Sequence, residues 1–156
     1  MTTVSNVRGA FVSCAVILLL ASPSTDHAQS TVEGVWINGD GDGWIELVIS
    51  NAELNGKIIG SPDDPNNKKP SRRDDKNPDA ALRSRPVRGL TILYGFHADG
   101  DQRWSGGRVY DPNSGNTYSG TITLIDAETL KLRGYIGIPL FGRTEIWIRR
   151  AERELK

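Results

Sequence analysis

Residues 74–90, DDKNPDAALRSRPVRGL, bring together carboxylate, amide and guanidinium side chains that could hold a ligand. A guanidinium group binds a carboxylate or a phosphate through two parallel hydrogen bonds, so arginines in such a group favour an anionic head group. The alternative interpretation is a plug that covers one end of the fold without binding anything. The candidate polar site consists of Asp75, Asn77, Asp79, Arg83 and Arg85.

Residues for catalysis are few. Beyond residue 28 the chain has one histidine, His97, and no cysteine, which argues against zinc chemistry and against a cysteine–histidine nucleophile. A carboxylate pair such as Asp75 with Asp79 could still act as acid and base. An enzyme is therefore left open but disfavoured, and we expect no cofactor and no assigned catalytic residue.

The stretch NGDGDG, residues 38–43, partly matches a calcium-binding EF-hand loop. Asn38, Asp40, Asp42 and Gly43 fit the first half of that loop, but Ile49 stands where the bidentate glutamate is required. Both flanks are predicted strands rather than helices. We therefore expect a hairpin turn here and no metal site.

The first 28 residues have the features of a secretory signal peptide. Arg8 is the only charge in the first 25 residues, and the apolar run GAFVSCAVILLLA covers residues 9–21. This run is shorter than the roughly 20 apolar residues that cross a bilayer. We expect cleavage after Ala28 and export to the periplasm or the medium. The exported domain would cover residues 29–156 and would not span a membrane. An uncleaved membrane anchor is the alternative.

The charge balance bears on the class of partner. The chain has 19 Lys and Arg against 19 Asp and Glu, which gives a formal net charge of zero. A nucleic-acid-binding domain would carry a basic excess, so we expect no nucleic-acid partner.

Strand patterns dominate the remainder of the chain. Ile45, Leu47 and Ile49 alternate with Trp44, Glu46 and Val48, as in a half-buried strand. Short links rich in Gly, Asn and Asp join the later strands, which favours antiparallel neighbours. Closing the sheet would remove its two edges, so we predict an all-β, eight-stranded antiparallel up-and-down β-barrel, with a sandwich as the alternative. The predicted strands are 32–38, 43–50, 53–60, 89–97, 103–111, 116–125, 129–137 and 143–150.

A long polar loop, residues 61–87, separates the third and fourth predicted strands. Asn77 is the predicted cap of a short helix, with Pro78 at its first position and Asp79 paired with Arg83. Leu82 and Val87 are the residues expected to pack this helix against the barrel.

Glycines and aromatic residues give further expectations. Glycines inside the strands, at 95, 106, 107, 120 and 134, are predicted to mark bends, bulges or close approaches of the backbone. Trp36 in the first strand is predicted to stack with Arg149 in the last, with Arg150 as the alternative partner. The candidate wall of a ligand site is aromatic with one arginine: Tyr94, Phe96, Trp104, Tyr110, Tyr118 and Arg108.

Several segments together resemble a known family. The order GVW, NGKIIG, NPDAALRSRP, GGRVYDPNSGNTY, LRGYIG and GRTEIWIRR is similar to the secreted bacterial domain of unknown function 2147, over residues 32–150. The GVW opening and the late arginine also resemble those of lipocalins. The resemblance implies a lipocalin-like or fatty-acid-binding-protein-like periplasmic barrel and lends no activity. Many members carry a cysteine pair around the second and third strands, which residues 49–60 lack here.

Two functions follow as hypotheses. The favoured one is a binding module for a small apolar or amphipathic molecule with an anionic head, such as a lipid-like compound or a metabolite. The alternative is a structural or protein-interaction module of the cell envelope, with side chains filling its barrel and an envelope protein as partner. The volume of the barrel interior would separate the two hypotheses.

Overall fold

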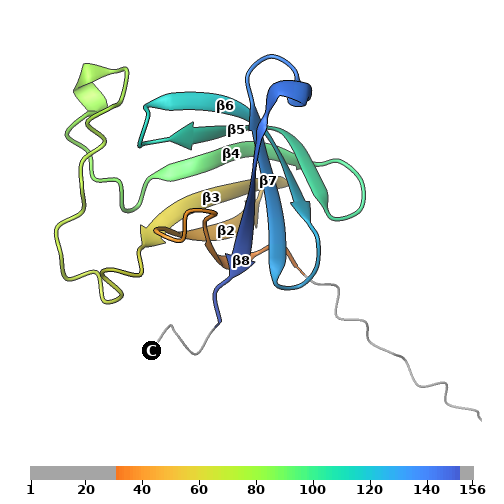
Figure 1. Ribbon diagram of the computed structural model, residues 1–156, viewed down its shortest axis with the longest axis horizontal. Coiled ribbons are helices and arrows are strands. Elements are labelled where there is room, and N and C mark those ends of the chain that lie inside the picture. Colours follow the sequence, from red (N-terminus) through yellow and green to blue (C-terminus); the bar gives the residue numbers. More distant parts are fainter. Residues whose placement is uncertain (1–30, 152–156) are drawn as a thin grey trace, which may run out of the picture.

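The computed structural model describes residues 31–151, and these form a closed barrel (Figure 1). The predicted signal peptide, residues 1–28, lies outside the described residues. The strands, each within a few residues of the predicted range, are β1 (Gly34–Ile37), β2 (Trp44–Ser50), β3 (Glu53–Gly60), β4 (Thr91–Ala98), β5 (Arg103–Asp111), β6 (Asn116–Leu124), β7 (Thr129–Tyr135) and β8 (Arg143–Arg149).

The barrel closes where the first strand meets the last. Every strand pairs antiparallel with the next, and β8 pairs with β1 through Trp36 opposite Arg149 and Ile37 opposite Ile148. This closed up-and-down order confirms the predicted barrel and excludes the sandwich. No helix within residues 31–151 has the length and apolar character needed to cross a membrane.

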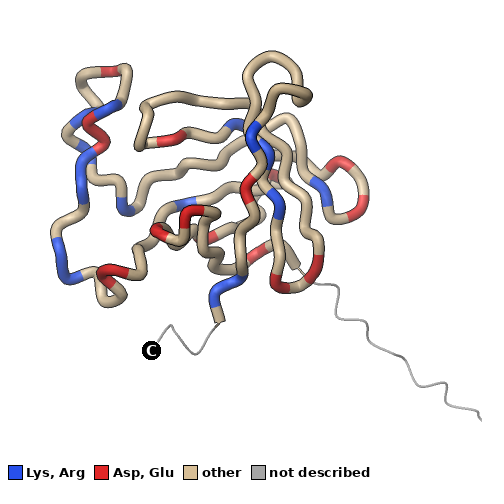
Figure 2. The backbone as a smooth tube through the Cα atoms, viewed as in Figure 1, with Lys and Arg blue, Asp and Glu red and all other residues tan. Residues whose placement is uncertain are grey.

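The up-and-down order gives the barrel two different ends. The connections 38–43, 61–90, 112–115 and 136–142 share one end, which we call the open end. The short turns after β2, β4 and β6 share the other, which we call the filled end. Lys, Arg, Asp and Glu are densest in the 61–90 segment, whereas the connections 112–115 and 136–142 contain none (Figure 2).

Large apolar side chains occupy the barrel toward the filled end. Trp36, Leu47, Leu54, Phe96 and Leu130 are fully buried and belong to one apolar cluster. Burial of apolar surface is the main favourable contribution to the folding free energy of this barrel, whose described part has no disulfide. Ile45 and Leu47 are buried as the alternation in β2 predicts, whereas Ile49, at the end of the strand, is exposed.

Two predicted strand glycines make room for Phe96. Gly107 and Gly120 face each other across β5 and β6. A Cβ atom at Gly120 would lie 2.7 Å from Cζ of Phe96, and one at Gly107 would overlap the same ring. Close approach of backbone to a ring is therefore the reason for glycine at both positions.

The Trp36–Arg149 contact closes the filled end. The Arg149 guanidinium lies 4.2 Å from the Trp36 ring centroid and donates hydrogen bonds to the backbone carbonyls of Thr31, Glu33 and Ala127. Arg150 stacks instead on Trp44, at 3.4 Å. The Arg149 guanidinium thus joins the chain before β1 to the β6–β7 turn.

The helical turn in the long loop differs from the prediction. The turn is a 3₁₀ helix, η1 (Ala80–Leu82), and its cap is Asp79, whose side chain accepts from the Ala81 N–H. Asn77 lies two residues before this cap, and its Oδ1 accepts from the Asp79 N–H in a turn that precedes the helix. Arg83 donates to the Asn77 carbonyl rather than pairing with Asp79.

The apolar residues around this turn also behave differently from one another. Val87 is buried, as predicted, but Leu82 is exposed, so the turn is held mainly by polar contacts.

The NGDGDG stretch forms the hairpin turn expected between β1 and β2. Asn38 Oδ1 accepts hydrogen bonds from the Asp42 and Gly43 N–H groups, at 3.0 and 2.8 Å. A neutral amide organises this turn, which leaves its carboxylates at the open end of the barrel.

Candidate functional site

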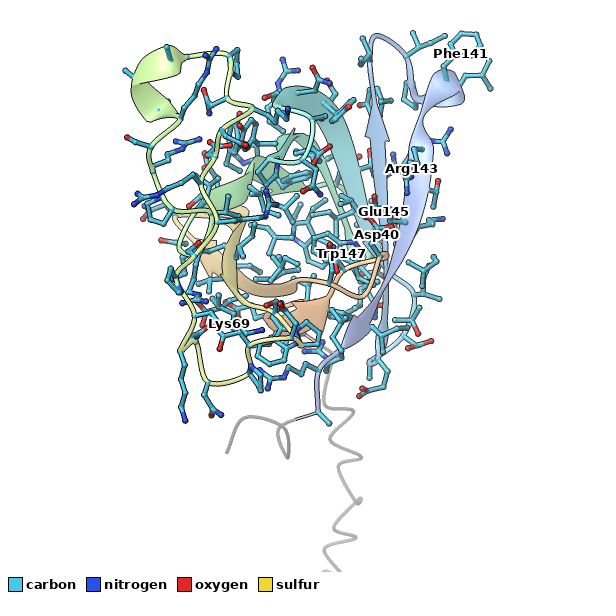
Figure 3. The ribbon with its side chains drawn as sticks, turned by 60° about the vertical axis from the view of Figure 1, so that its left-hand side comes forward. Asp40, Lys69, Phe141, Arg143, Glu145 and Trp147 are labelled. Carbon is cyan, nitrogen blue, oxygen red and sulfur yellow. The ribbon has the colours of Figure 1, made fainter. Side chains whose placement is uncertain are left out.

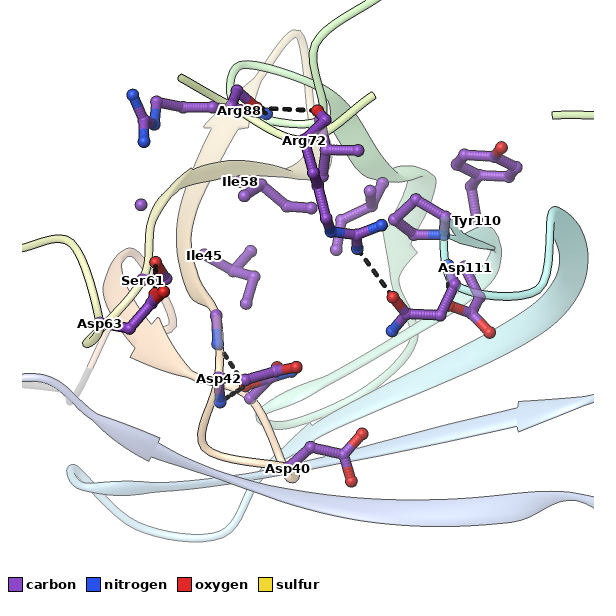
Figure 4. A pocket seen from close by; sticks show the side chains of 18 of the residues that line it. Asp40, Asp42, Ile45, Ile58, Ser61, Asp63, Arg72, Arg88, Tyr110 and Asp111 are labelled. Atoms are coloured by element: carbon purple, nitrogen blue, oxygen red, sulfur yellow. Dashed lines mark hydrogen bonds between the residues drawn. The ribbon is translucent and has the colours of Figure 1, made fainter. Parts of the chain in front are cut away.

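A partly open cavity of about 510 Å³ lies at the open end of the barrel (Figure 4). Three of the four connections of that end, 38–43, 61–90 and 112–115, contribute to its wall, together with β8. Its inner part is apolar and is lined by side chains from six strands, Ile45, Ile58, Ile92, Val109, Leu132 and Trp147. The cavity therefore lies directly above the apolar core, several of whose residues form its floor.

The rim of this cavity is charged and largely paired. Arg88 binds Asp64 at 2.9 Å, and Lys69 lies 3.6 Å from Asp63. On β8, Arg143 lies 3.7 Å from Asp40 in the β1–β2 turn. Two of these pairs lie within the 61–90 segment, and the third joins β8 to the 38–43 turn.

Asp64 is the best-anchored carboxylate of the rim. It accepts from the backbone N–H groups of Lys68 and Lys69 as well as from Arg88. Burial acts to raise the pKa of Asp64, but these hydrogen bonds and the Arg88 charge outweigh it and lower the pKa. Asp64 is therefore a fixed anion that orders the segment 61–72.

Arg72 differs from the paired cations of the rim. Its guanidinium reaches across the cavity and donates to the neutral amide oxygen of Asn113, at 2.8 Å (Figure 4). Its own carbonyl accepts from the Val87 N–H, so the backbone that carries it is fixed. Because the Asn113 contact neutralises no charge, the guanidinium can also receive an anion.

A second cavity, of about 330 Å³, adjoins the first along β7 and β8. The two share five lining residues, Val109, Asp111, Leu132, Arg143 and Glu145. The outer wall of the second cavity is Tyr118, Tyr135, Ile136 and Phe141. Figure 3 shows Phe141 at the tip of the β7–β8 hairpin, with Arg143, Glu145 and Trp147 following along β8 toward the barrel interior.

A buried polar cluster ties the long loop to β5. The Asp74 side chain is fully buried and accepts hydrogen bonds from Tyr110, Asn77 and Arg85, at 2.6, 2.8 and 2.8 Å. Burial acts to raise the pKa of Asp74, yet these three donors lower it. Burial and the adjacent Asp74 raise the pKa of Tyr110. Since every member has a partner within the cluster, its evident role is anchorage.

The structure disperses the candidate ligand residues predicted from the sequence. Tyr110 lines the first cavity and Tyr118 the second. Phe96 is packed in the core and Trp104 packs against it. The remaining candidates line neither cavity: Asn77 and Arg85 belong to the Asp74 cluster, whereas Asp75, Asp79, Arg83, Tyr94 and Arg108 are exposed.

The rim cations Arg72, Arg88 and Arg143 were not among the sequence candidates. The missed signal was topological, because alternate connections of an up-and-down barrel must meet at one end. That rule brings residues 38–43, 61–72, 112–113 and 143 together. Counting charges within a single loop could not reveal it.

A closed, eight-stranded barrel with a cavity at one end is a lipocalin-like architecture. Protein HP1028 from the human pathogen Helicobacter pylori, described as belonging to the lipocalin family, matches with a TM-score of 0.72 and 21% identity, over 80% of this chain and 86% of that chain. At that identity the likeness shows the fold alone. A redesigned β-barrel matches with a TM-score of 0.39 and 16% identity, over 77% of this chain and 91% of that chain, and carries no argument.

The chain belongs to the family described as "Uncharacterized protein conserved in bacteria (DUF2147)", whose model matches residues 34–149. A comparison with curated proteins finds no match. The family and the fold agree with the resemblance seen in the sequence, and the family supplies no activity to transfer.

Proposed function

We propose that this protein is an exported binding module for a small amphipathic molecule with an apolar body and an anionic head. The observation that carries the proposal is the cavity of about 510 Å³, apolar inside and charged at its rim. Ligand sites in proteins are commonly of this size and character. The alternative hypothesis of a barrel filled throughout by side chains is less well supported, because a cavity of about 510 Å³ lies at the open end.

The apolar body of the ligand would lie against the inner wall of the cavity. Ile45, Ile58 and Val109 face this space from three different strands. Because Phe96 and its neighbours occupy the filled end, the site accepts a short chain or a compact ring rather than a molecule that threads the barrel.

The preference for an anion comes from Arg72. Carboxylates outnumber cations on the rim, but Asp40, Asp63 and Asp64 already have cationic partners. Asp42 and Asp111 accept hydrogen bonds from the neutral side chains of Asn38 and Ser114. The Arg72 guanidinium lies at the cavity opening, where its partner is the neutral amide of Asn113. A ligand carboxylate placed there would gain a charge-assisted hydrogen bond.

Calorimetric titration with three ten-carbon probes tests the proposal. Decanoate, decanol and decylamine share one apolar body and differ in head group. We expect decanoate to bind most tightly, and Arg72→Ala to weaken decanoate by about tenfold while leaving decanol within roughly twofold.

Arg108→Ala is the matched control, since Arg108 is an exposed β5 arginine that donates to Ser119 and lines neither cavity. Equal losses for the two arginine variants would contradict the assignment of the head group. Failure of all three probes to bind would contradict the binding module.

A further inference from the structure

The β7–β8 connection exposes an apolar tip. Four large apolar side chains within six residues project into solvent: Ile136, Ile138, Leu140 and Phe141, with exposed fractions of 74%, 55%, 76% and 79%. Residues 136–142, IGIPLFG, contain no charge, and Figure 2 shows this tip uncharged with basic residues just below it. A contiguous exposed apolar group of this kind is a sign of an interaction surface.

The tip is held in place by an arginine. The Arg133 guanidinium donates to the carbonyls of Pro139 and Leu140 and to the Thr144 hydroxyl. These contacts fix the 3₁₀ turn η2 (Pro139–Phe141) against the strands on either side. The apolar side chains are therefore presented in an ordered shape, so that little conformational entropy is lost when the tip is buried.

Two arginines flank the base of the tip. Arg133 lies on β7 and Arg143 on β8. The Arg143 side chain is 75% exposed and lies 3.7 Å from Asp40 and 3.9 Å from Glu145. Exposed apolar side chains with Arg133 and Arg143 at their base match the bilayer interface. There the apolar tip would contact acyl chains and the guanidinium groups would contact lipid phosphates. An arginine close to an anionic lipid surface adds to the attraction.

The tip is also continuous with the ligand site. Ile136 and Phe141 line the second cavity, which shares five residues with the first. Because the tip and the wall of this cavity share these two residues, a lipid surface that covered the tip would also border the cavity.

We propose that the β7–β8 tip docks the protein on an anionic phospholipid bilayer, and that the bilayer exchanges ligand with the barrel through the second cavity. The exchange step rests on the proposed function. Docking itself does not, because it requires only the tip and its arginines.

Vesicle flotation tests the docking. The protein, expressed from the full chain, is mixed with vesicles of phosphatidylglycerol and phosphatidylethanolamine, or of phosphatidylcholine alone. We expect flotation with the anionic vesicles, less with the neutral ones, and a loss of roughly tenfold or more in partitioning for Ile138→Ser with Leu140→Ser. The matched control is Val48→Ser with Ile49→Ser, which removes two exposed apolar side chains from β2.

A single-cysteine probe locates the contact. In a Cys14→Ser background, Leu140→Cys is labelled with an environment-sensitive dye, and Asp126→Cys in the β6–β7 turn at the filled end serves as control. We expect the emission of the dye at position 140 to shift to the blue on anionic vesicles and that at position 126 to stay unchanged.

Three results would overturn docking: no flotation, flotation that Ile138→Ser with Leu140→Ser leaves intact, or equal shifts at the two dye positions. Self-association through the tip without vesicle binding would assign the tip to a second copy and also overturn the proposal.

Decanoate titration of the same serine variant without vesicles separates the two claims, since Ile138 and Leu140 line neither cavity. Intact decanoate binding with failed flotation overturns docking alone. Failed binding of decanoate by the unaltered protein with intact flotation overturns the binding module alone.

Discussion

The Tyr110 hydroxyl donates a 2.6 Å hydrogen bond to Oδ1 of Asp74, which joins the middle of the long β3–β4 loop to the end of β5. The carboxylate is fully buried, and Asn77 and Arg85 satisfy its other oxygen. Burying a carboxylate that has a single partner costs free energy, but here three donors stabilise the Asp74 charge. The loop that forms part of the cavity rim is therefore anchored by one ionised side chain.

Asp74→Asn is expected to lower the free energy of unfolding by about 1–3 kcal/mol at pH 7, because the variant loses charge-assisted hydrogen bonds. The folded protein holds the pKa of Asp74 below its ordinary value of 3.8. The contribution is therefore fully present above that pH and is lost as pH falls through the lowered pKa. The difference between the unaltered protein and the variant should shrink below about pH 4.

Urea titrations from pH 3 to 7 measure this difference. Asp75→Asn removes the same charge from the neighbouring exposed residue and should follow the unaltered protein throughout. A constant difference between the unaltered protein and Asp74→Asn over the whole pH range would contradict the assigned ionisation.

Arg149→Lys is expected to destabilise the barrel by about 1–3 kcal/mol, although it conserves charge. Lysine cannot reproduce the forked contacts to Thr31, Glu33 and Ala127 while stacking on Trp36. Arg103→Lys, at an exposed i,i+4 pair with Asp99, should change stability by less than about 0.5 kcal/mol. Similar midpoints of chemical unfolding for the two variants would show that the filled end does not depend on this guanidinium.

Gly107→Ala is expected to cost about 1–3 kcal/mol, because its methyl group would overlap the Phe96 ring. Gly134→Ala is the matched control: its Cβ would lie 3.7 Å from the nearest atom, an ordinary contact, and should cost little. Phe96→Leu should relieve the overlap, so the double variant should lose less stability than the sum of the single changes. Strict additivity in thermal unfolding would mean that glycine serves some purpose other than admitting the ring.

The sequence predicted the barrel well because local rules determine it. Period-two alternation and short turns predict that each strand pairs with the next one along the chain. When eight strands in that order close into a barrel, the first strand must pair with the last. The Trp36–Arg149 contact followed from that closure, because the first and last strands must then pair. Gly107 and Gly120 were expected to mark bends, bulges or close approaches, and only the fold shows that they admit the Phe96 ring.

The site was less predictable because its residues meet only through the topology. Arg72 stands in a run of polar residues without strand character, where a charge is normally solvated, and nothing local indicates that it spans a cavity. Asp74 follows two residues later and is fully buried, which no hydropathy pattern predicts for a carboxylate. The helix cap was misplaced by two residues because Asn77 and Asp79 are both good caps, and the Asp74 cluster determines the role of Asn77.

Methyl NMR during a decanoate titration tests the central claim most directly, namely that the open end of this barrel holds a small amphipathic ligand while the filled end does not. We predict saturable shifts for the methyl groups of Ile45, Ile58 and Val109, which line the cavity, and unchanged signals for those of Leu54 and Leu130, which pack beyond it. Unchanged signals from Ile45, Ile58 and Val109 at saturating decanoate, or equal shifts at both ends, would contradict the account.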